Sequence, residues 1–342
     1  MLTSSNILRH TPPSGPGPAG VAHTPTSLML RTDEPMGCMF RLMYTNINEV
    51  ATVLPQYYDA YGRREPVGPA HIPTSFLAGQ PELAYFDLLN RDPDRVRMFM
   101  RAMGVAHRRV PTTGMFDVDA LLLANQEDRD RDGAPARIAW VDLGGGDGHT
   151  LKLFRAAHPA LRSRRCVVQD LPEVLAAAKE AAKRDEDLVE GVDWIPLDFH
   201  HEKPVEGTSP PPFLFFFFFF SFFFSSFSLV HYSTDPKKTG ALVYYLRHIL
   251  RDYSDPVCAT ILSNVRRSMS PDGSSRVLVA EQVHSAPPPL YAAFKDYSMI
   301  AIGGKERTLD QFGAVAAAAG LRVAAVHADK GTAHAVVEMV LA

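Results

Sequence analysis

The sequence predicts an α/β fold in which helices cover both faces of a mostly parallel sheet. From about Arg137 to the C-terminus, short apolar runs alternate with amphipathic segments, a pattern typical of parallel strand–helix units. The first apolar run leads directly into a glycine-rich turn, Val141 to Gly148. Before it, from about Ser27 to Ala124, the pattern is helical. We therefore expect a helical region followed by an α/β domain.

The alternation places the expected elements along the second half of the chain. Strands are expected at 138–143, 165–169, 241–247, 276–282 and 334–341, and helices at 150–157, 172–183, 256–269 and 308–319. Ligands of open α/β sheets bind outside the carboxyl ends of the strands. We therefore expect the strand ends at Gly144, Asp170, Arg251 and Glu281 to surround one crevice.

The N-terminal part divides into two stretches. Residues 1–20 are rich in proline and glycine and lack the apolar core of a signal peptide, so we expect them to be disordered or extended. Residues 21–125 are expected to be helical. Asp92 would cap a helix that begins at Pro93. That helix carries Phe99 and Met103, which fit a hydrophobic core or, alternatively, a substrate pocket.

Composition excludes several kinds of partner and site. The 342 residues carry a net charge of −3, so no nucleic-acid partner is indicated. Three widely spaced cysteines, Cys38, Cys166 and Cys258, lack metal-ligand spacing and indicate a reducing compartment. We therefore expect a cytoplasmic protein without a metal site. Membrane association is not expected either.

The glycine-rich turn predicts a cofactor site. A dinucleotide fingerprint needs glycine at its first, third and sixth positions, but counting from Gly144 the sixth residue is His149. A loop dense in glycine suits a cofactor without a pyrophosphate, such as S-adenosyl-L-methionine (SAM), whose binding the following helix N-terminus would assist. A strand–turn–helix without any ligand is the alternative reading.

Two acidic positions follow the next apolar stretches. Asp170 ends the second expected strand, where a carboxylate can accept hydrogen bonds from both ribose hydroxyls; a helix cap before Pro172 is compatible with this role. Asp198 and Phe199 suit an adenine, because the acid accepts from the amino group while the ring stacks. For Asp198, a solvated loop acid is the alternative.

A stretch of phenylalanine and serine, Phe213 to Val230, fits neither pattern. Its length approaches that of a membrane span, but a span here would interrupt the α/β domain. Pyrimidine-rich nucleic acid gives such a composition when it is translated. We interpret residues 207–239 as a retained intron, whose removal would join Glu206 to Gly240 by a normal loop.

Five motifs in one order carry a family resemblance. They are the Gly144 turn, Asp170-Leu171-Pro172, the segment from Tyr244 to Asp255, Glu281, and the segment from Gly304 to Thr308. Together they resemble the plant caffeate-type and fungal SAM-dependent O-methyltransferases over about residues 21–342, apart from the phenylalanine-rich insert. The resemblance implies a class I methyltransferase (Rossmann-like) sheet over 126–342. It also implies a helical dimerisation region, a homodimer, and a small phenolic or polyketide-like substrate of secondary metabolism.

The resemblance also implies residue roles and a truncation. Contacts to SAM are implied at Gly144, Gly146, Asp170, Leu171, Asp198, Phe199 and Arg247. Phe99 and Met103 fall where the family lines its acceptor pocket. The family opens with a longer winged-helix segment, of which residues 21–125 retain only the tail around Val21 to Thr24. Part of the dimer interface and of the pocket is therefore expected to be missing.

Arg251 departs from the family at the expected general base. The family has histidine immediately before the Asp252-Tyr253 pair, and the histidine takes the proton of the acceptor hydroxyl. Arginine cannot be deprotonated in a protein, so it cannot act as that base. Glu281 and Glu306, the acids that orient the family's histidine, would pair with the guanidinium instead.

Three readings of the function remain open. The first is an O-methyltransferase in which Arg251 stabilises a phenolate, or in which His248 replaces the base; in a strand, however, His248 and Arg251 would face opposite sides, and a structural histidine is the alternative. The second follows from the Arg251-Asp252 pair, which resembles leporin-type methyltransferase-like pericyclases that bind SAM without transferring its methyl group. The third reading is a SAM-binding relative without catalytic activity, or a broken gene product; the truncated start and the phenylalanine-rich insert favour it rather than Arg251.

Overall fold

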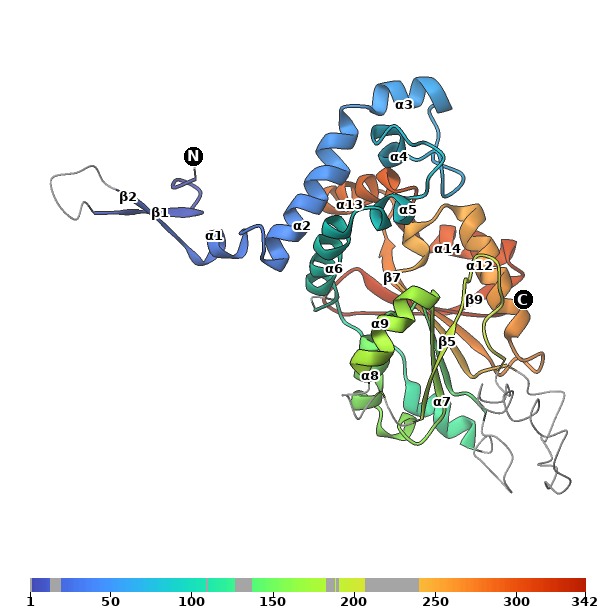
Figure 1. Ribbon diagram of the computed structural model, residues 1–342. Helices are drawn as coiled ribbons and strands as arrows, with labels where there is room; N and C mark the ends of the chain where they lie inside the picture. Colours follow the sequence, from blue (N-terminus) through green and yellow to red (C-terminus); the bar gives the residue numbers. More distant parts are fainter. Residues whose placement is uncertain are drawn as a thin grey trace, which may run out of the picture. The chain divides into compact units, whose positions relative to one another are not determined.

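The computed structural model describes residues 2–12, 20–108, 110–126, 137–182, 188, 191–206 and 240–342 (Figure 1). The chain forms two units, of which the first comprises Met1–Val110 and Ala293–Gly304 and the second Pro111–Ala292 and Lys305–Ala342. The predicted insert, 207–239, lies outside the described residues. Among the described residues, no helix is both long enough and apolar enough to span a membrane.

The second unit is built on the predicted sheet. Its strands are β3 (Trp140–Leu143), β4 (Cys166–Asp170), β5 (Val192–Pro196), β6 (Val243–Arg247), β7 (Arg276–His284), β8 (Arg307–Thr308), β9 (Leu321–Ala328) and β10 (His334–Leu341). The order is β5-β4-β3-β6-β7-β10-β9, with β8 added to β7. Pairings from β5 to β7 are parallel, whereas β10 is antiparallel to β7 and β9. All five predicted strands are confirmed; β5, β8 and β9 are additional.

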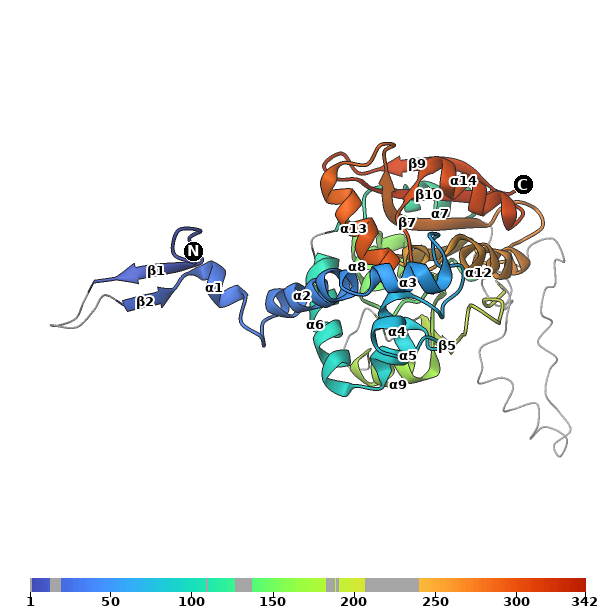
Figure 2. The ribbon, with the colours of Figure 1, turned by 90° about the horizontal axis from the view of Figure 1, so that it is seen from above.

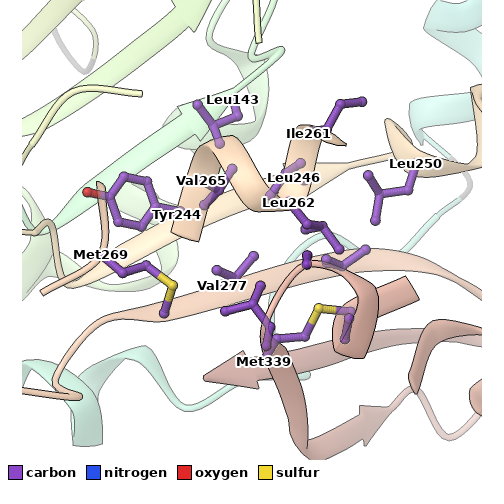
Figure 3. Packing of buried hydrophobic residues seen from close by; sticks show 14 of the residues in the cluster. Leu143, Tyr244, Leu246, Leu250, Ile261, Leu262, Val265, Met269, Val277 and Met339 are labelled. Atoms are coloured by element: carbon purple, nitrogen blue, oxygen red, sulfur yellow. The ribbon is translucent and has the colours of Figure 1, made fainter. Parts of the chain in front are cut away.

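Helices cover both faces of this sheet, as predicted (Figure 1). They are α7 (Val118–Ala124), α8 (His149–Ala157), α9 (Pro172–Ala182), α12 (Asp255–Ser268) and α14 (Leu309–Ala318), with 3-10 turns η3 (Pro159–Leu161) and η5 (Leu250–Asp252). Successive strand side chains alternate between two cores: Val141 packs with α12 and α14, and Trp140 with α8 and α9. Figure 3 shows the first of these cores. Because both faces are buried, the central strands are almost wholly apolar.

The first unit is helical apart from a two-stranded hairpin, β1 (Leu8–Thr11) with β2 (Gly20–His23), whose strands run side by side in Figure 2. The other elements are α1 (Pro25–Met29), α2 (Pro35–Tyr44), the π-helix η1 (Thr45–Glu49), α3 (Leu54–Tyr61), α4 (Pro73–Leu77), α5 (Tyr85–Asn90), α6 (Pro93–Arg108) and α13 (Leu290–Ala301). The predicted cap of α6 is confirmed, because Oδ1 of Asp92 accepts from the backbone N–H groups of Asp94 and Arg95.

Candidate functional site

The glycine turn after β3 takes a backbone path that side chains would obstruct. Gly144, Gly146 and Gly148 have φ angles of +66°, +56° and +77°, in the left-handed region that glycine adopts at no steric cost. A Cβ at Gly144 would lie 2.5 Å from Cδ1 of Ile249, whereas one at Gly146 would meet no atom within 4 Å. The turn is therefore closely packed at its start and open in its middle.

Asp170 lies against this turn. Its Oδ2 accepts from the backbone N–H of Gly146 at 2.9 Å, and its Oδ1 accepts from that of Leu171 at 2.8 Å. Burial raises the pKa of Asp170, and these two backbone donors lower it. A carboxylate accepts about four hydrogen bonds, so lone pairs remain for a ligand. The structure thus brings together Gly146, Asp170 and the partly exposed Leu171.

Phe199 approaches the same turn from the segment that follows β5. Its Cε1 lies 3.7 Å from the position that a Cβ on Gly144 would take. The carbonyl of Phe199 accepts from Nδ2 of Asn264 at 2.9 Å, which ties this segment to α12. Asp198 is 40 % exposed at its side chain and accepts from the N–H of His200. The aromatic ring is therefore part of the cluster, and a solvent-facing acid precedes it.

A buried acid that the sequence analysis did not single out lies beneath the turn. Asp142 is 2 % exposed, and a Cβ on Gly145 would lie 2.9 Å from its carboxyl group. Burial raises the pKa of Asp142 to about 7, while the charge of Arg247 lowers it. Arg247 is itself 9 % exposed, and burial lowers its pKa. The signal in the sequence was a single acid inside the otherwise apolar β3.

Arg251 sits on η5, between β6 and α12, in a charged cluster. Its Nη2 lies 2.8 Å from Oε1 of Glu306, a side chain that is 1 % exposed. Oε1 of Glu281 accepts from the backbone N–H groups of Leu250 and Arg251, at 3.0 and 3.4 Å. The N–H of Lys305 donates to the carbonyl of Arg251 at 2.8 Å, which holds the Glu306 segment against the turn. The structure thus places both predicted acids at Arg251.

Three carboxyl groups, those of Glu281, Asp252 and Glu306, act electrostatically on the cluster around Arg251. Burial raises the pKa of Glu281 to about 8; Arg251 lowers it, and Glu306 and Asp252 raise it further. Desolvation likewise raises the pKa of Asp252 to about 7, against the effect of Arg251. Glu281 and Asp252 thus have pKa values raised into the neutral range by burial, and the Arg251 charge opposes this in both cases.

His248 does not continue the preceding strand. Strand β6 ends at Arg247, and His248 has a φ of +55°, a conformation uncommon for a residue other than glycine. Its N–H donates to the carbonyl of Ala280 at 3.2 Å, and its ring centroid lies 5.8 Å from that of His334. The strand geometry assumed in the sequence analysis therefore ends one residue before His248, and its role as a base stays a prediction.

The two predicted pocket residues lie in hydrophobic clusters of the first unit. Phe99 is partly buried and contacts Tyr85 and Phe86 edge-on, with ring centroids 6.3 and 6.0 Å apart. Met103 packs in a second cluster, with Cys38 and the same Phe99. Their contacts are those of core residues, and pocket lining stays a prediction.

The first unit has a cavity of its own, which the sequence did not indicate. It has a volume of about 770 Å³ and lies between α3, the segment after it, and α13. Its lining residues are Ala51, Leu54, Pro55, Tyr58, Asp59, Arg63, Arg64, Glu65 and Ile300. In the described part of the chain, this cavity included, no three His, Cys, Asp or Glu side chains group in a way that could hold a metal ion.

Comparison with known proteins gives one domain match and close relatives. Residues 236–322 match the O-methyltransferase domain family. The chain is 31 % identical to Methyltransferase pynC of Aspergillus niger over 344 aligned positions, which cover 100 % of this chain and 81 % of that protein. It is 30 % identical to Methyltransferase phm5 of Pyrenochaetopsis sp, over 100 % of this chain and 81 % of the relative.

Solved structures share the fold. OxaC in complex with SAH and oxaline matches with a TM-score of 0.72 and 22 % identity, over 98 % of this chain and 72 % of that one. The LepI complex with SAM matches with a TM-score of 0.72 and 21 % identity, over 99 % and 74 % of the two chains. The central sheet and its N-terminal helical region are thus common to these proteins and this chain.

Proposed function

Because this chain belongs to the family of fungal methyltransferases with an O-methyltransferase domain, we propose that it binds SAM at the glycine turn and acts on a small phenolic or polyketide-like molecule. The family uses SAM as its methyl donor. One observation carries the proposal. Gly146, Asp170 and Phe199, from three separate segments, converge at the carboxyl ends of β3, β4 and β5.

The residues present fit this cofactor. The open side of Gly146 leaves room beside Asp170, whose remaining lone pairs would accept from ribose hydroxyls. Phe199 and Ile249, both near Gly144, would enclose the adenine. Bound there, SAM supplies an electrophilic methyl group on a positively charged sulfur.

Arg251 would stabilise the acceptor rather than deprotonate it. A fixed guanidinium placed where negative charge develops lowers the barrier electrostatically, but it cannot take a proton. The acceptor would reach the site as a phenolate that has already lost its proton to solvent, and Arg251 would hold its anionic oxygen toward the methyl group that SAM supplies when bound. Glu306 and Glu281 would hold the guanidinium and its turn in place, as their distances suggest.

Arg251 also favours a second candidate function, a SAM-dependent pericyclase. Here the guanidinium would polarise a substrate carbonyl while the sulfonium charge stays in place, so the cofactor would not be consumed. The support is Arg251 itself, a partly buried cation in place of the expected base. A SAM-binding relative without catalysis is the third possibility.

One experiment distinguishes methyl transfer, pericyclase activity and SAM binding without catalysis. The full chain is incubated with methyl-labelled SAM and with candidate phenols or pyridone alcohols, and both label and substrate are followed. Label in the product supports methyl transfer. Substrate conversion with SAM unconsumed supports the pericyclase. SAM binding without conversion supports the non-catalytic relative, and absence of SAM binding contradicts the whole proposal.

Replacement of Arg251 tests the base argument. Arg251→His should raise methyl transfer to a phenol, by about tenfold or more, because general-base catalysis contributes about 10² to 10⁴. The matched control is Arg276→His, at an arginine that pairs with Glu338 at 2.8 Å at the start of β7. Unchanged transfer with unchanged SAM affinity would mean that the base position does not limit this site.

Oligomeric state and location are part of the proposal. The helical residues 21–125 would form a homodimer interface, since apolar side chains on α2 and α6 are exposed: Phe40 by 62 %, Tyr44 by 50 % and Met100 by 63 %. Light scattering on the purified chain tests this. The three cysteines are free and buried, which supports a reducing location such as the cytoplasm.

A further inference from the structure

A buried histidine lies next to the Arg251 cluster and has no part in the proposed chemistry so far. His284 is the last residue of β7, and its side chain is 6 % exposed. The parallel pairing of β7 with β8 sets His284 opposite Thr308. Since Glu306 immediately precedes β8, this register brings the imidazole to the carboxylate: Nε2 of His284 lies 3.8 Å from Oε2 of Glu306.

Glu306 therefore faces a basic side chain with each of its two oxygens. Oε1 lies 2.8 Å from Nη2 of Arg251, and Oε2 faces His284. A separation of 3.8 Å is too long for a hydrogen bond but is within reach of an ion pair. In the described residues, Nε2 of His284 makes no hydrogen bond. An imidazole that gains a proton here would compete with Arg251 for the same buried carboxylate.

Other titratable groups surround this pair. Asp252 on η5 and Glu281 on β7 act on the same cluster electrostatically. At the neighbouring strand ends, the rings of His248 and His334 face each other at 5.8 Å. Imidazole is the side chain that ordinarily changes charge between about pH 5 and pH 8. The position of His284, 3.8 Å from Glu306, ties its charge to the carboxylate that holds Arg251.

We propose that His284 is a positioning residue whose charge decides, through Glu306, how much of the Arg251 charge is available to the acceptor. When His284 is neutral, Glu306 neutralises Arg251. When His284 is protonated, Glu306 is shared between two cations, and Arg251 can pair with an anionic oxygen of the substrate. The inference rests on the proposed function, because it assumes that the acceptor binds at Arg251.

Binding of a stable anion tests this without any turnover. The probe is 2,4-dinitrophenolate, which stays ionised over the pH range used, titrated into the full chain saturated with S-adenosylhomocysteine. For the unaltered chain we expect affinity to rise at least about fivefold from about pH 8 to about pH 5.5, the lower range of a coupling free energy between sites. His284→Gln should lose most of this rise, and keep the affinity seen at about pH 8.

Two further variants test whether the pH dependence of probe binding acts through Glu306 and Arg251. Glu306→Gln removes the competing carboxylate, so the probe should bind more tightly than to the unaltered chain at about pH 8, and only the part of the pH dependence due to Glu281 and Asp252 should remain. Arg251→Gln should abolish the binding. The matched control is His327→Gln, since His327 forms a histidine–glutamate pair with Glu338 at 2.9 Å on β9 and β10. His327→Gln should bind the probe with the same pH profile as the unaltered chain, including any part of the profile due to Glu281 and Asp252.

A spectroscopic measurement keeps the proposal testable if a variant folds poorly. In histidine-labelled chain, the His284 signal, assigned by its loss in His284→Gln or His284→Asn, should titrate at lower pH in Glu306→Gln. An unshifted titration overturns the coupling, as does a pH profile of probe binding that His284→Gln leaves intact, or absence of probe binding at either pH. Failure of methyl transfer with the pH-dependent binding present would count against the proposed function alone.

Discussion

Glu281 links the charged cluster to the stability of the fold. Its folded-state pKa of about 8 lies above its ordinary value of 4.5, because the side chain is buried. The native protein therefore holds a proton that the unfolded chain releases. The contribution of Glu281 to stability is fully present below about pH 4.5, falls as the pH rises, and is lost above about pH 8.

Glu281→Gln should flatten this dependence. Between about pH 5 and pH 8, the free energy of unfolding of the unaltered chain should fall more steeply, by up to about 1.4 kcal/mol per pH unit, than that of the variant. Urea unfolding at several pH values measures it. The control is Asp310→Asn on the exposed start of α14. If the free energy of unfolding of the unaltered chain and of Glu281→Gln changed with pH in parallel, this would contradict a buried, protonated Glu281.

The glycine turn matters as an element because two separate constraints act on it. Gly144 is left-handed and is also packed against Ile249, whereas Gly273, in the turn before β7, is left-handed and a Cβ there would meet no atom within 4 Å. The left-handed backbone conformation is a local constraint that acts at both glycines. The contact with Ile249 depends on the segment after β6 and acts only at Gly144. A single comparison can therefore separate backbone strain from the shape of the cofactor site.

Gly144→Ala should lose both stability and cofactor binding, and Gly273→Ala stability alone. Each incurs the left-handed penalty of roughly 1–2 kcal/mol, but only the methyl group at 144 would displace Ile249, 2.5 Å away. We expect at least about tenfold weaker S-adenosylhomocysteine binding for Gly144→Ala, about 1.4 kcal/mol, measured by calorimetry. Equal affinities for both variants would remove the turn from the cofactor site.

Helix α6 supplies a test in the first unit. Asp92→Ala removes the side chain that accepts from Asp94 and Arg95, and should lower stability by about 1 kcal/mol. Asp92→Asn, which keeps a capping oxygen, is the control and should stay close to the unaltered chain. Thermal unfolding measures both, and equal losses in the two variants would argue against the cap.

At the scale of the whole molecule, the segments on either side of the predicted insert meet. The backbone N–H of Ala241 donates to the hydroxyl of Tyr244 at 3.0 Å, and the carbonyl of Val205 lies 3.0 Å from the same oxygen. Val205 and Ala241 thus lie beside the same hydroxyl group. We propose on this basis that residues 207–239 are dispensable.

Deletion of 207–239 tests this proposal. A chain with Glu206 joined to Gly240 should fold to the same sheet and give a higher soluble yield, since the phenylalanine run favours aggregation. Circular dichroism, thermal unfolding and S-adenosylhomocysteine affinity are the measurements. A second variant with a short glycine–serine linker controls for strain at the new junction. Loss of folding in both variants would show that the segment is needed.

Much of the second unit could be predicted because buried parallel strands are continuous apolar runs. Strands β5 and β9 were not predicted, for a physical reason. They lie at the two ends of the strand order and mix buried with more exposed positions, so neither is uniformly apolar. Helix α13 is another case. Its residues from Ala293 belong to the first unit although they follow β7 in the chain, and periodicity carries no information about such partners.

The sequence by itself determined the glycine turn, the strand that precedes it, and the arginine in place of the family's base, because these depend on local residue types. The acids Glu281 and Glu306 at Arg251 were expected from the family resemblance, but only the tertiary structure revealed two further buried titratable groups, Asp142 and His284. Asp142 lies inside an apolar strand, and His284 reaches Glu306 through the register of β7 with β8. The burial of Asp142 and the contact of His284 both depend on strand pairing between segments that are distant in the chain. Local residue patterns carry no information about such pairing.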